Sequence, residues 1–126
     1  MNEDIYGIKK WGNDILEILE NGNIGLKNPF QPHNPPTDLI KIIKSLNERG
    51  ISCPVLLRVT DYLAFRIKQI NNSFFEAIKE IGYKGDYKGV FPVKVNQQAQ
   101  VIDRIVEFGK EFDFGLEVGS KPELLI

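Results

Sequence analysis

The sequence of 126 residues is poor in the residue types that build crosslinked or metal-stabilised proteins. Its single cysteine, Cys53, excludes an internal disulfide and a multi-cysteine metal site. Its single histidine, His33, lies among prolines and has no partner at metal-ligand spacing. We therefore predict no metal site on this chain, and we expect His33 to be exposed and Cys53 to pack as a small apolar side chain.

Net charge and long apolar runs are also lacking. The sequence has 16 basic and 17 acidic residues, a formal charge of -1, and the two signs are interspersed. This balance favours neither nucleic acid nor an anionic membrane surface as a partner. No apolar run approaches the length of a membrane span. The acidic residues 1–4 do not resemble the start of a secretory signal, so we expect a cytoplasmic protein.

The first part of the sequence predicts a β-hairpin followed by a linker. Two mainly apolar runs, residues 15–19 and 24–27, flank Asn21-Gly22, and Asn-Gly between apolar runs is the strongest short hairpin signal. Residues 28–36 are rich in proline and show no periodicity, which is typical of an extended loop. We therefore expect a first segment, residues 1–36, made of a hairpin and a proline-rich linker.

From Thr37 onward, helix and strand patterns alternate. Apolar periodicity predicts three helices, over residues 37–49, 60–83 and 97–108. Thr37 and Thr60 are the predicted caps of the first two. Buried strands are predicted over residues 52–59, 89–95 and 112–118. This alternation is typical of an α/β protein with a parallel sheet, and it fits either a (β/α) barrel or a doubly wound sheet.

The predicted strand 89–95 places a lysine inside an apolar run. Period-two alternation puts Phe91, Val93 and Val95 on one face and Lys94, with Asn96, on the other. Strands of parallel sheets are usually buried on both faces, so such a lysine needs a partner or a chemical role. A desolvated lysine is a nucleophilic amine suited to Schiff-base chemistry. The alternative is a lysine with a buried stem and a solvated amine.

The next predicted strand, residues 112–118, carries a second polar side chain, Glu117. If the two strands are parallel neighbours, Lys94 and Glu117 both emerge at their carboxyl ends, where barrel enzymes build active sites. The alternative for Glu117 is a salt bridge to Lys94 or Lys121. Beyond this strand, Ser120 with Glu123 three residues later is a helix-start signature.

Residues 87–98 resemble the pyridoxal-phosphate (PLP) lysine motif of biosynthetic arginine decarboxylases, which belong to the alanine-racemase-like barrel class of PLP enzymes. Residues 115–124 are similar to the next strand and helix start of that family. Shorter blocks fit in the same order at residues 6–8 with 11–13, at residues 54–58, and at residues 70–71 with 74. A lysine-x-asparagine alone is a weak signal, but ordered blocks along nearly the whole chain are a strong one.

The resemblance implies the fold and the site. Residues 37–126 would be the N-terminal portion of a PLP-binding (β/α)8 TIM-type barrel, incomplete in this chain because so few strands cannot close one. Lys94 would be the catalytic residue that holds the cofactor. Glu117 would lie against the cofactor and its lysine, with Ser120 nearby at a helix start. Asn96 joins the cofactor-binding set, although we expect it mainly to orient local structure.

The resemblance also implies a reaction and partners. The substrate would be L-arginine, converted to agmatine and CO2 for polyamine and spermidine synthesis, in a homo-oligomer with shared active sites. Mg2+ is suggested by the family alone, since the sequence shows no site for it. The alternatives are another decarboxylase of this PLP class, acting on ornithine, lysine or diaminopimelate, or a non-catalytic binding or regulatory half-barrel. Residues 6–8 and 11–12 favour the arginine enzyme.

The last predicted helix starts at Ser120 and stops within about one turn, in apolar residues 124–126. We therefore expect the chain to be the N-terminal part of a longer protein; a genuine terminus docked into the core is the alternative. In the family, the phosphate-binding loop and the substrate contacts lie beyond this segment. By itself the chain is expected to be inactive, and open sheet edges are expected to make it self-associate.

Overall fold

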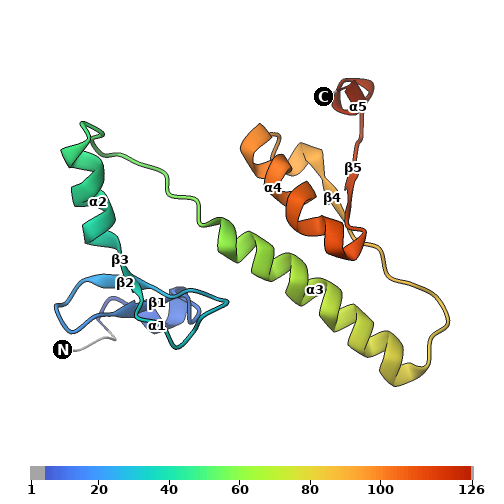
Figure 1. The fold of residues 1–126 in the computed structure, drawn as a ribbon, viewed down its shortest axis with the longest axis horizontal. Coiled ribbons are helices and arrows are strands. Elements are labelled where there is room, and N and C mark those ends of the chain that lie inside the picture. The colour runs from blue at the N-terminus through green and yellow to red at the C-terminus, as the bar shows by residue number, and fades with distance from the viewer. Residues whose placement is uncertain (1–4, 126) are drawn as a thin grey trace. The chain divides into compact units, whose positions relative to one another are not determined.

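The computed structural model describes residues 5–125, and the chain divides into two compact units between Arg58 and Val59 (Figure 1). This division differs from the expected boundary after residue 36, because the strand and helix that follow residue 36 pack within the first unit. The assignment of residues 37–126 to a partial barrel stays a prediction. No helix in the described part of the chain is long and apolar enough to cross a membrane.

The first unit is built on a small antiparallel sheet. After the short helix α1 (Ile8–Trp11), strands β1 (Leu16–Ile18) and β2 (Ile24–Leu26) pair antiparallel and confirm the predicted hairpin. Gly22 in its turn has φ 82, a conformation that glycine adopts without strain. A third strand, β3 (Thr37–Asp38), pairs with β2 and was not predicted.

Helix α2 (Leu39–Glu48) begins one residue later than predicted and uses a different cap. Thr37 pairs with Leu26 in the sheet, so it cannot serve as the helix cap. The cap is Asp38, whose Oδ1 accepts hydrogen bonds from the backbone N–H groups of Ile40 (2.9 Å) and Lys41 (3.4 Å). The helix start is therefore tied directly to the edge of the sheet.

The predicted buried strand over residues 52–59 is wrong for the structure described. No segment among residues 5–125 pairs with it, and Leu56 is 74% exposed. An apolar run alone does not make a strand, because a strand also needs a neighbour for its backbone groups. The sequence pattern carries no information about whether that neighbour is present.

The second unit alternates helices with two parallel strands and confirms the predicted order from residue 60 onward. Its elements are α3 (Thr60–Ile81), β4 (Val90–Pro92), α4 (Ala99–Gly109), β5 (Gly115–Glu117) and α5 (Lys121–Leu125), with 3-10 turns at Val93–Val95 and Lys110–Phe112. Thr60 is the first helical residue of α3 and not its cap, because Val59 occupies the cap position without a side-chain bond. Gly82, with φ 64, ends the helix.

Strands β4 and β5 are parallel neighbours, as predicted, and α4 connects them. The register pairs Val90 with Gly115 and Pro92 with Glu117. Helix α4 packs on α3, and the buried apolar side chains of this unit are Ile67, Val93 and Ile105. The strand–helix–strand arrangement sets both strand carboxyl ends at the same edge of the sheet.

Candidate functional site

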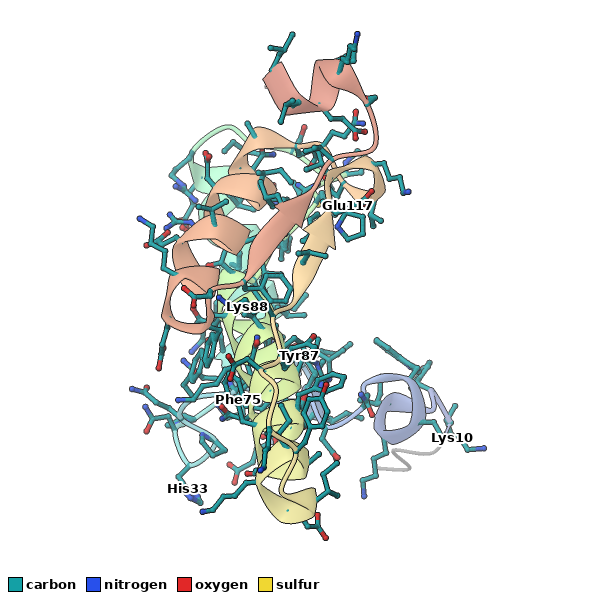
Figure 2. All side chains as sticks on the ribbon, turned by 90° about the vertical axis from the view of Figure 1, so that its right-hand side faces the viewer. Lys10, His33, Phe75, Tyr87, Lys88 and Glu117 are labelled. Carbon is teal, nitrogen blue, oxygen red and sulfur yellow. The ribbon has the colours of Figure 1, made fainter. Side chains whose placement is uncertain are left out.

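The carboxyl ends of β4 and β5 carry the residues on which the predicted site depends. Figure 2 shows Glu117 at this end of the strands, near α5, whereas Lys88, Tyr87 and Phe75 lie toward the opposite end. The last pair of the ladder joins Pro92 to Glu117, and Lys94 follows Pro92 by two residues. Parallel pairing therefore brings the two predicted site residues to one edge, as the sequence indicated.

The lysine itself lies just beyond the strand. Strand β4 ends at Pro92, and Lys94 is the middle residue of the 3-10 turn Val93–Val95. The predicted alternation through residue 95 is therefore wrong after Pro92: Val93 is 5% exposed, but Val95 is 69% exposed. A 3-10 turn repeats every three residues instead of two, so successive side chains no longer alternate between two faces.

The side chain of Lys94 is exposed and makes no hydrogen bond or ion pair with any residue in the described range 5–125. The alternative of a salt bridge between Glu117 and either Lys94 or Lys121 is thus not observed there. Glu117 is half-buried at the end of β5. The desolvated lysine expected from a continuous strand is not found in the described residues, where Lys94 is exposed on the turn after β4.

Asn96 orients the chain that leaves the lysine turn. Its Oδ1 accepts a hydrogen bond from the backbone N–H of Gln98, 3.1 Å away, and Gln98 is the N-cap residue of helix α4. Such a bond is a typical asparagine turn, which fixes the direction of the backbone. A contact between Asn96 and a cofactor stays a prediction, as do those of Lys94, Glu117 and Ser120.

Ser120 and Glu123 form the predicted helix start of α5. The Ser120 Oγ accepts from the backbone N–H of Glu123 at 3.4 Å, and the Glu123 Oε2 accepts from the backbone N–H of Gly119 at 2.6 Å. Both ends of the turn between β5 and α5 are therefore held by side chains. This turn follows Glu117 directly in the chain.

Glu123 has a further role that the sequence analysis did not identify. The Nε2 of Gln97 donates to the Oε1 of Glu123 at 3.3 Å. Gln97 belongs to the segment after the lysine turn, and Glu123 to the first turn after β5, so this bond joins two segments that are 26 residues apart. Sequence spacing reveals the helix cap but cannot reveal a contact made across parallel strands.

The opposite end of the strands is closed by aromatic packing. The rings of Phe74 and Tyr87 stack with centroids 3.9 Å apart, and the Nζ of Lys88 lies 3.4 Å from the Oδ2 of Asp113. These contacts anchor the segment that leads into β4. They position the strand whose other end carries Lys94, and none of them involves a predicted site residue.

The remaining candidates do not assemble into a site. His33 is exposed, as predicted. Cys53 is also exposed, so the prediction that it packs as a small apolar side chain is wrong. Among residues 5–125, no group of three or more histidine, cysteine, aspartate or glutamate side chains could hold a metal ion. In the first unit, the hydrogen bonds of Asp38 lower the pKa of its carboxyl, with the amide of Asn23 as the largest cause and burial opposing it.

The chain is similar to curated biosynthetic arginine decarboxylases along nearly its whole length. It is 46% identical to the enzyme of Gloeobacter violaceus over 98% of this chain. It is 48% identical to that of Prochlorococcus marinus (strain MIT 9312) over 96% of the chain, and 44% identical to that of Thermosynechococcus vestitus over 99%. The chain spans 18–20% of the length of these relatives. No family model matches the sequence.

A solved structure with the same fold is the crystal structure of the biosynthetic arginine decarboxylase from Campylobacter jejuni. It superposes with a TM-score of 0.83 at 37% sequence identity, covering 99% of this chain and 20% of that protein. This likeness confirms the α/β class predicted from the alternating pattern. It also confirms that the resemblance noticed around the lysine motif extends along the chain.

Proposed function

We propose, from the homology of this chain to biosynthetic arginine decarboxylases, that it forms the cofactor-lysine portion of an enzyme that converts L-arginine to agmatine and CO2. The observation that carries the proposal is that sequence identity of 44–48% and a common fold extend over 96–99% of the chain. Since the chain spans about a fifth of those relatives, we propose that the complete reaction also uses the parts of the enzyme outside the aligned segment.

The fold proposed for residues 37–126 is part of a (β/α)8 barrel. The parallel pair β4–β5, joined through α4, supports it, because strand–helix–strand units of this kind build such barrels. Barrel enzymes place their chemistry at the carboxyl ends of the strands. Lys94 and Glu117 lie at those ends here.

The residues at this edge fit the covalent attachment of PLP. The amine of Lys94 is exposed and makes no ion pair or hydrogen bond among residues 5–125, so no carboxylate competes for it. An aldehyde cofactor needs such an available amine. When bound, PLP supplies the electron sink that allows the α-carboxylate to leave as CO2. We propose Lys94 as the residue that holds it.

The other predicted site residues would supply a negative charge at this edge of the sheet and fix the backbone around it. Glu117, half-buried at the end of β5, brings a carboxylate to the same edge as the Lys94 amine. Ser120 holds the following turn through its bond to Glu123, and Asn96 holds the turn before α4. In this proposal Glu117 faces the cofactor, whereas Asn96 and Ser120 contribute chiefly by fixing the backbone on either side of it.

The wider context is proposed on the same homology. Relatives named for arginine favour L-arginine over ornithine, lysine or diaminopimelate as the substrate. Agmatine would supply polyamine and spermidine synthesis in the cytoplasm. We further propose a homo-oligomer with shared active sites, without nucleic acid or membrane partners. Any Mg2+ would be held by residues elsewhere in the enzyme, since the described residues offer no cluster for it.

A chimeric enzyme tests the proposed function. The aligned segment of the Campylobacter jejuni enzyme is replaced by residues 1–126, and agmatine release is measured. We expect the chimera to release agmatine. The substitution Lys94→Arg in the chimera should lower kcat/KM by at least about a hundredfold, because arginine cannot replace the nucleophilic amine. Lys88→Arg is the matched control, since it keeps a cation facing Asp113 at the other end of the strand.

Two results would contradict the proposal. A folded, oligomeric chimera that releases no agmatine would favour the non-catalytic half-barrel. Retention of activity by the Lys94→Arg chimera would remove Lys94 from the chemistry while leaving the family relationship intact.

A further inference from the structure

Beyond the last ladder pair, strands β4 and β5 continue into two separate turns. One is the 3-10 turn Val93–Val95 that carries Lys94, and the other is the turn that follows Glu117 and leads into α5. Parallel pairing ends at Pro92 and Glu117, so the backbone ladder does not set the spacing of these turns. The spacing of these turns therefore also depends on contacts made beyond the ladder.

Glu123 bonds both to the turn after Glu117 and to the segment that follows the Lys94 turn. Its Oε2 accepts from the backbone N–H of Gly119 at 2.6 Å, and its Oε1 accepts from the Nε2 of Gln97 at 3.3 Å. A carboxylate can accept several hydrogen bonds with its two oxygens, and bonds to a charged acceptor are stronger than neutral ones. One side chain therefore links the segment after Lys94 to the segment after Glu117.

The carboxylate of Glu117 lies next to the same turn. A Cβ placed on Gly119 would stand 3.5 Å from the Oε2 of Glu123 and 3.7 Å from the Oε1 of Glu117. Both carboxylates thus lie close to the same backbone position. A shift of the Gly119 turn changes the position of Glu117 together with the support that the lysine segment receives through Gln97.

We propose that Glu123, acting through Gln97, is a positioning residue that holds the Lys94 turn at the correct distance from Glu117 for cofactor attachment. The inference rests on the proposed function, because it assigns the attachment to Lys94. It does not place Glu123 in contact with the cofactor or the substrate. Its effect should appear as a change in how readily Lys94 takes up the cofactor, and not as a loss of fold.

A donor–acceptor exchange tests this role in the full 126-residue chain. The variant Gln97→Glu sets one carboxylate against another and breaks the bond, whereas Gln97→Glu combined with Glu123→Gln restores a donor and an acceptor in exchanged positions. Gln100→Glu is the matched control, since it adds the same charge three residues further along at an exposed position without a described partner.

The measurement is the extent of labelling at Lys94 by pyridoxal 5′-phosphate followed by borohydride, located by peptide mass spectrometry. Dividing by the label that acetic anhydride leaves at Lys94 corrects for simple exposure of the amine. Exposed Lys68 on α3 serves as an internal reference, and circular dichroism checks that helix content is unchanged. The ratio at Lys94 does not depend on catalytic activity.

Gln97→Glu should lower the corrected Lys94 ratio about threefold to tenfold, the range for one hydrogen bond to a charged group at a partly exposed site. The exchanged double variant should return to within about twofold of the parent, and Gln100→Glu should match the parent. An unchanged ratio in Gln97→Glu, or no recovery in the double variant, would overturn the positioning role.

The parent chain separates this failure from failure of the proposed function. If the parent labels Lys94 no better than Lys68, the positioning role is rejected, whereas the Lys94→Arg chimera decides by itself whether Lys94 is the cofactor lysine. If the parent labels Lys94 preferentially but the exchange has no effect, the cofactor lysine stands and only the role of Glu123 is wrong. If Gln97→Glu alters helix content, Gln97→Ala replaces it, because alanine removes the donor without adding a charge.

Discussion

The rings of Phe74 and Tyr87 stack face to face, with centroids 3.9 Å apart and planes 5° from parallel. Phe74 lies on α3, and Tyr87 lies in the segment that leads into β4. The pair therefore fastens the strand that carries the lysine turn to the long helix beside it. Together with the bond between Gln97 and Glu123 at the far end, it leaves the βαβ unit held at both ends of its strands.

The first prediction concerns this stack. Tyr87→Ala should lower the free energy of unfolding of the second unit by about 1 kcal/mol for the ring pair, plus the loss from buried apolar area. Urea unfolding of the full chain measures it. Tyr83→Ala is the control, because that ring is 62% exposed and stacks on no other ring in the described chain; equal losses in the two variants would contradict the prediction.

A second prediction concerns the close approach at Gly89. A Cβ there would lie 2.3 Å from the ring of Phe114, a distance that forces the ring or the backbone to move. Gly89→Ala should therefore destabilise the unit by about 1–3 kcal/mol. At Gly115 the nearest atom would be 3.6 Å away, an ordinary contact, so Gly115→Ala provides the control. Thermal unfolding compares them, and Phe114→Leu should recover part of the loss at Gly89.

The third prediction is a pH dependence in the first unit. The hydrogen bond from Asn23, with smaller contributions from Asn21 and the α2 backbone, lowers the pKa of Asp38 below its ordinary value of 3.8. Its stabilisation is therefore complete above about that pH and is lost as the pH falls through the lower folded-state pKa. The Asp38→Asn variant should therefore not show this loss of stability as the pH falls.

Circular dichroism of the full chain, followed as the pH is lowered, measures this effect. Asp86→Asn is the control, since Asp86 is exposed and makes no hydrogen bond or ion pair within residues 5–125. Identical acid transitions in the parent and Asp38→Asn would show that the Asp38 cap does not govern the stability of this unit in acid.

The fourth prediction concerns the open edges of the β4–β5 ladder. Val90 on β4 is 56% exposed, and unpaired strand edges promote association with other chains. We expect the purified chain to self-associate with increasing concentration. Val90→Lys should reduce this, because a lysine on an edge strand opposes edge-to-edge pairing.

Sedimentation velocity measures the association. Val95→Lys is the control, since Val95 is 69% exposed but lies in the 3-10 turn outside the ladder. A chain that stays monomeric at all concentrations, or that responds equally to both substitutions, would argue against edge pairing as the cause.

The fifth prediction concerns catalysis by the chain alone. Catalysis by preorganised charges depends on a site from which water is excluded, whereas Lys94 is exposed in the described structure. The purified chain with added PLP should therefore release no more agmatine from L-arginine than its Lys94→Arg variant does. Release clearly above that of the variant would show that the chain contains a working active site, and isotopically labelled CO2 from carboxyl-labelled arginine gives an independent measure.

Several elements could be predicted because their signals are local. The Asn21-Gly22 hairpin, the three long helices after residue 36 and the Ser120–Glu123 helix start all depend on side chains within a few residues of one another. Turn chemistry and apolar periodicity act over such distances. The parallel pairing of β4 with β5 could also be predicted from the sequence, since two strands joined by one helix usually pair in this way.

Other features depended on partners that sequence order does not reveal. Asp38 caps α2 because Thr37 is held in the sheet by Leu26, and residues 52–59 form no strand because no described segment pairs with them. Strand β4 was expected to run through Val95, but it ends at Pro92 where its pairing with β5 ends. In each case a competing long-range contact, or its absence, decided between local options of similar energy.

The sequence by itself determined the α/β alternation, the lysine set in an apolar run and the carboxylate on the following strand, because these are properties of residue type and spacing. Only the tertiary structure decided that Lys94 stands on an exposed turn beyond the strand, and that Glu123 reaches across to Gln97. The physical reason is that spacing along a chain fixes which face a side chain takes within one element. The end of a ladder and the contacts beyond it are set by whichever segments fold against one another.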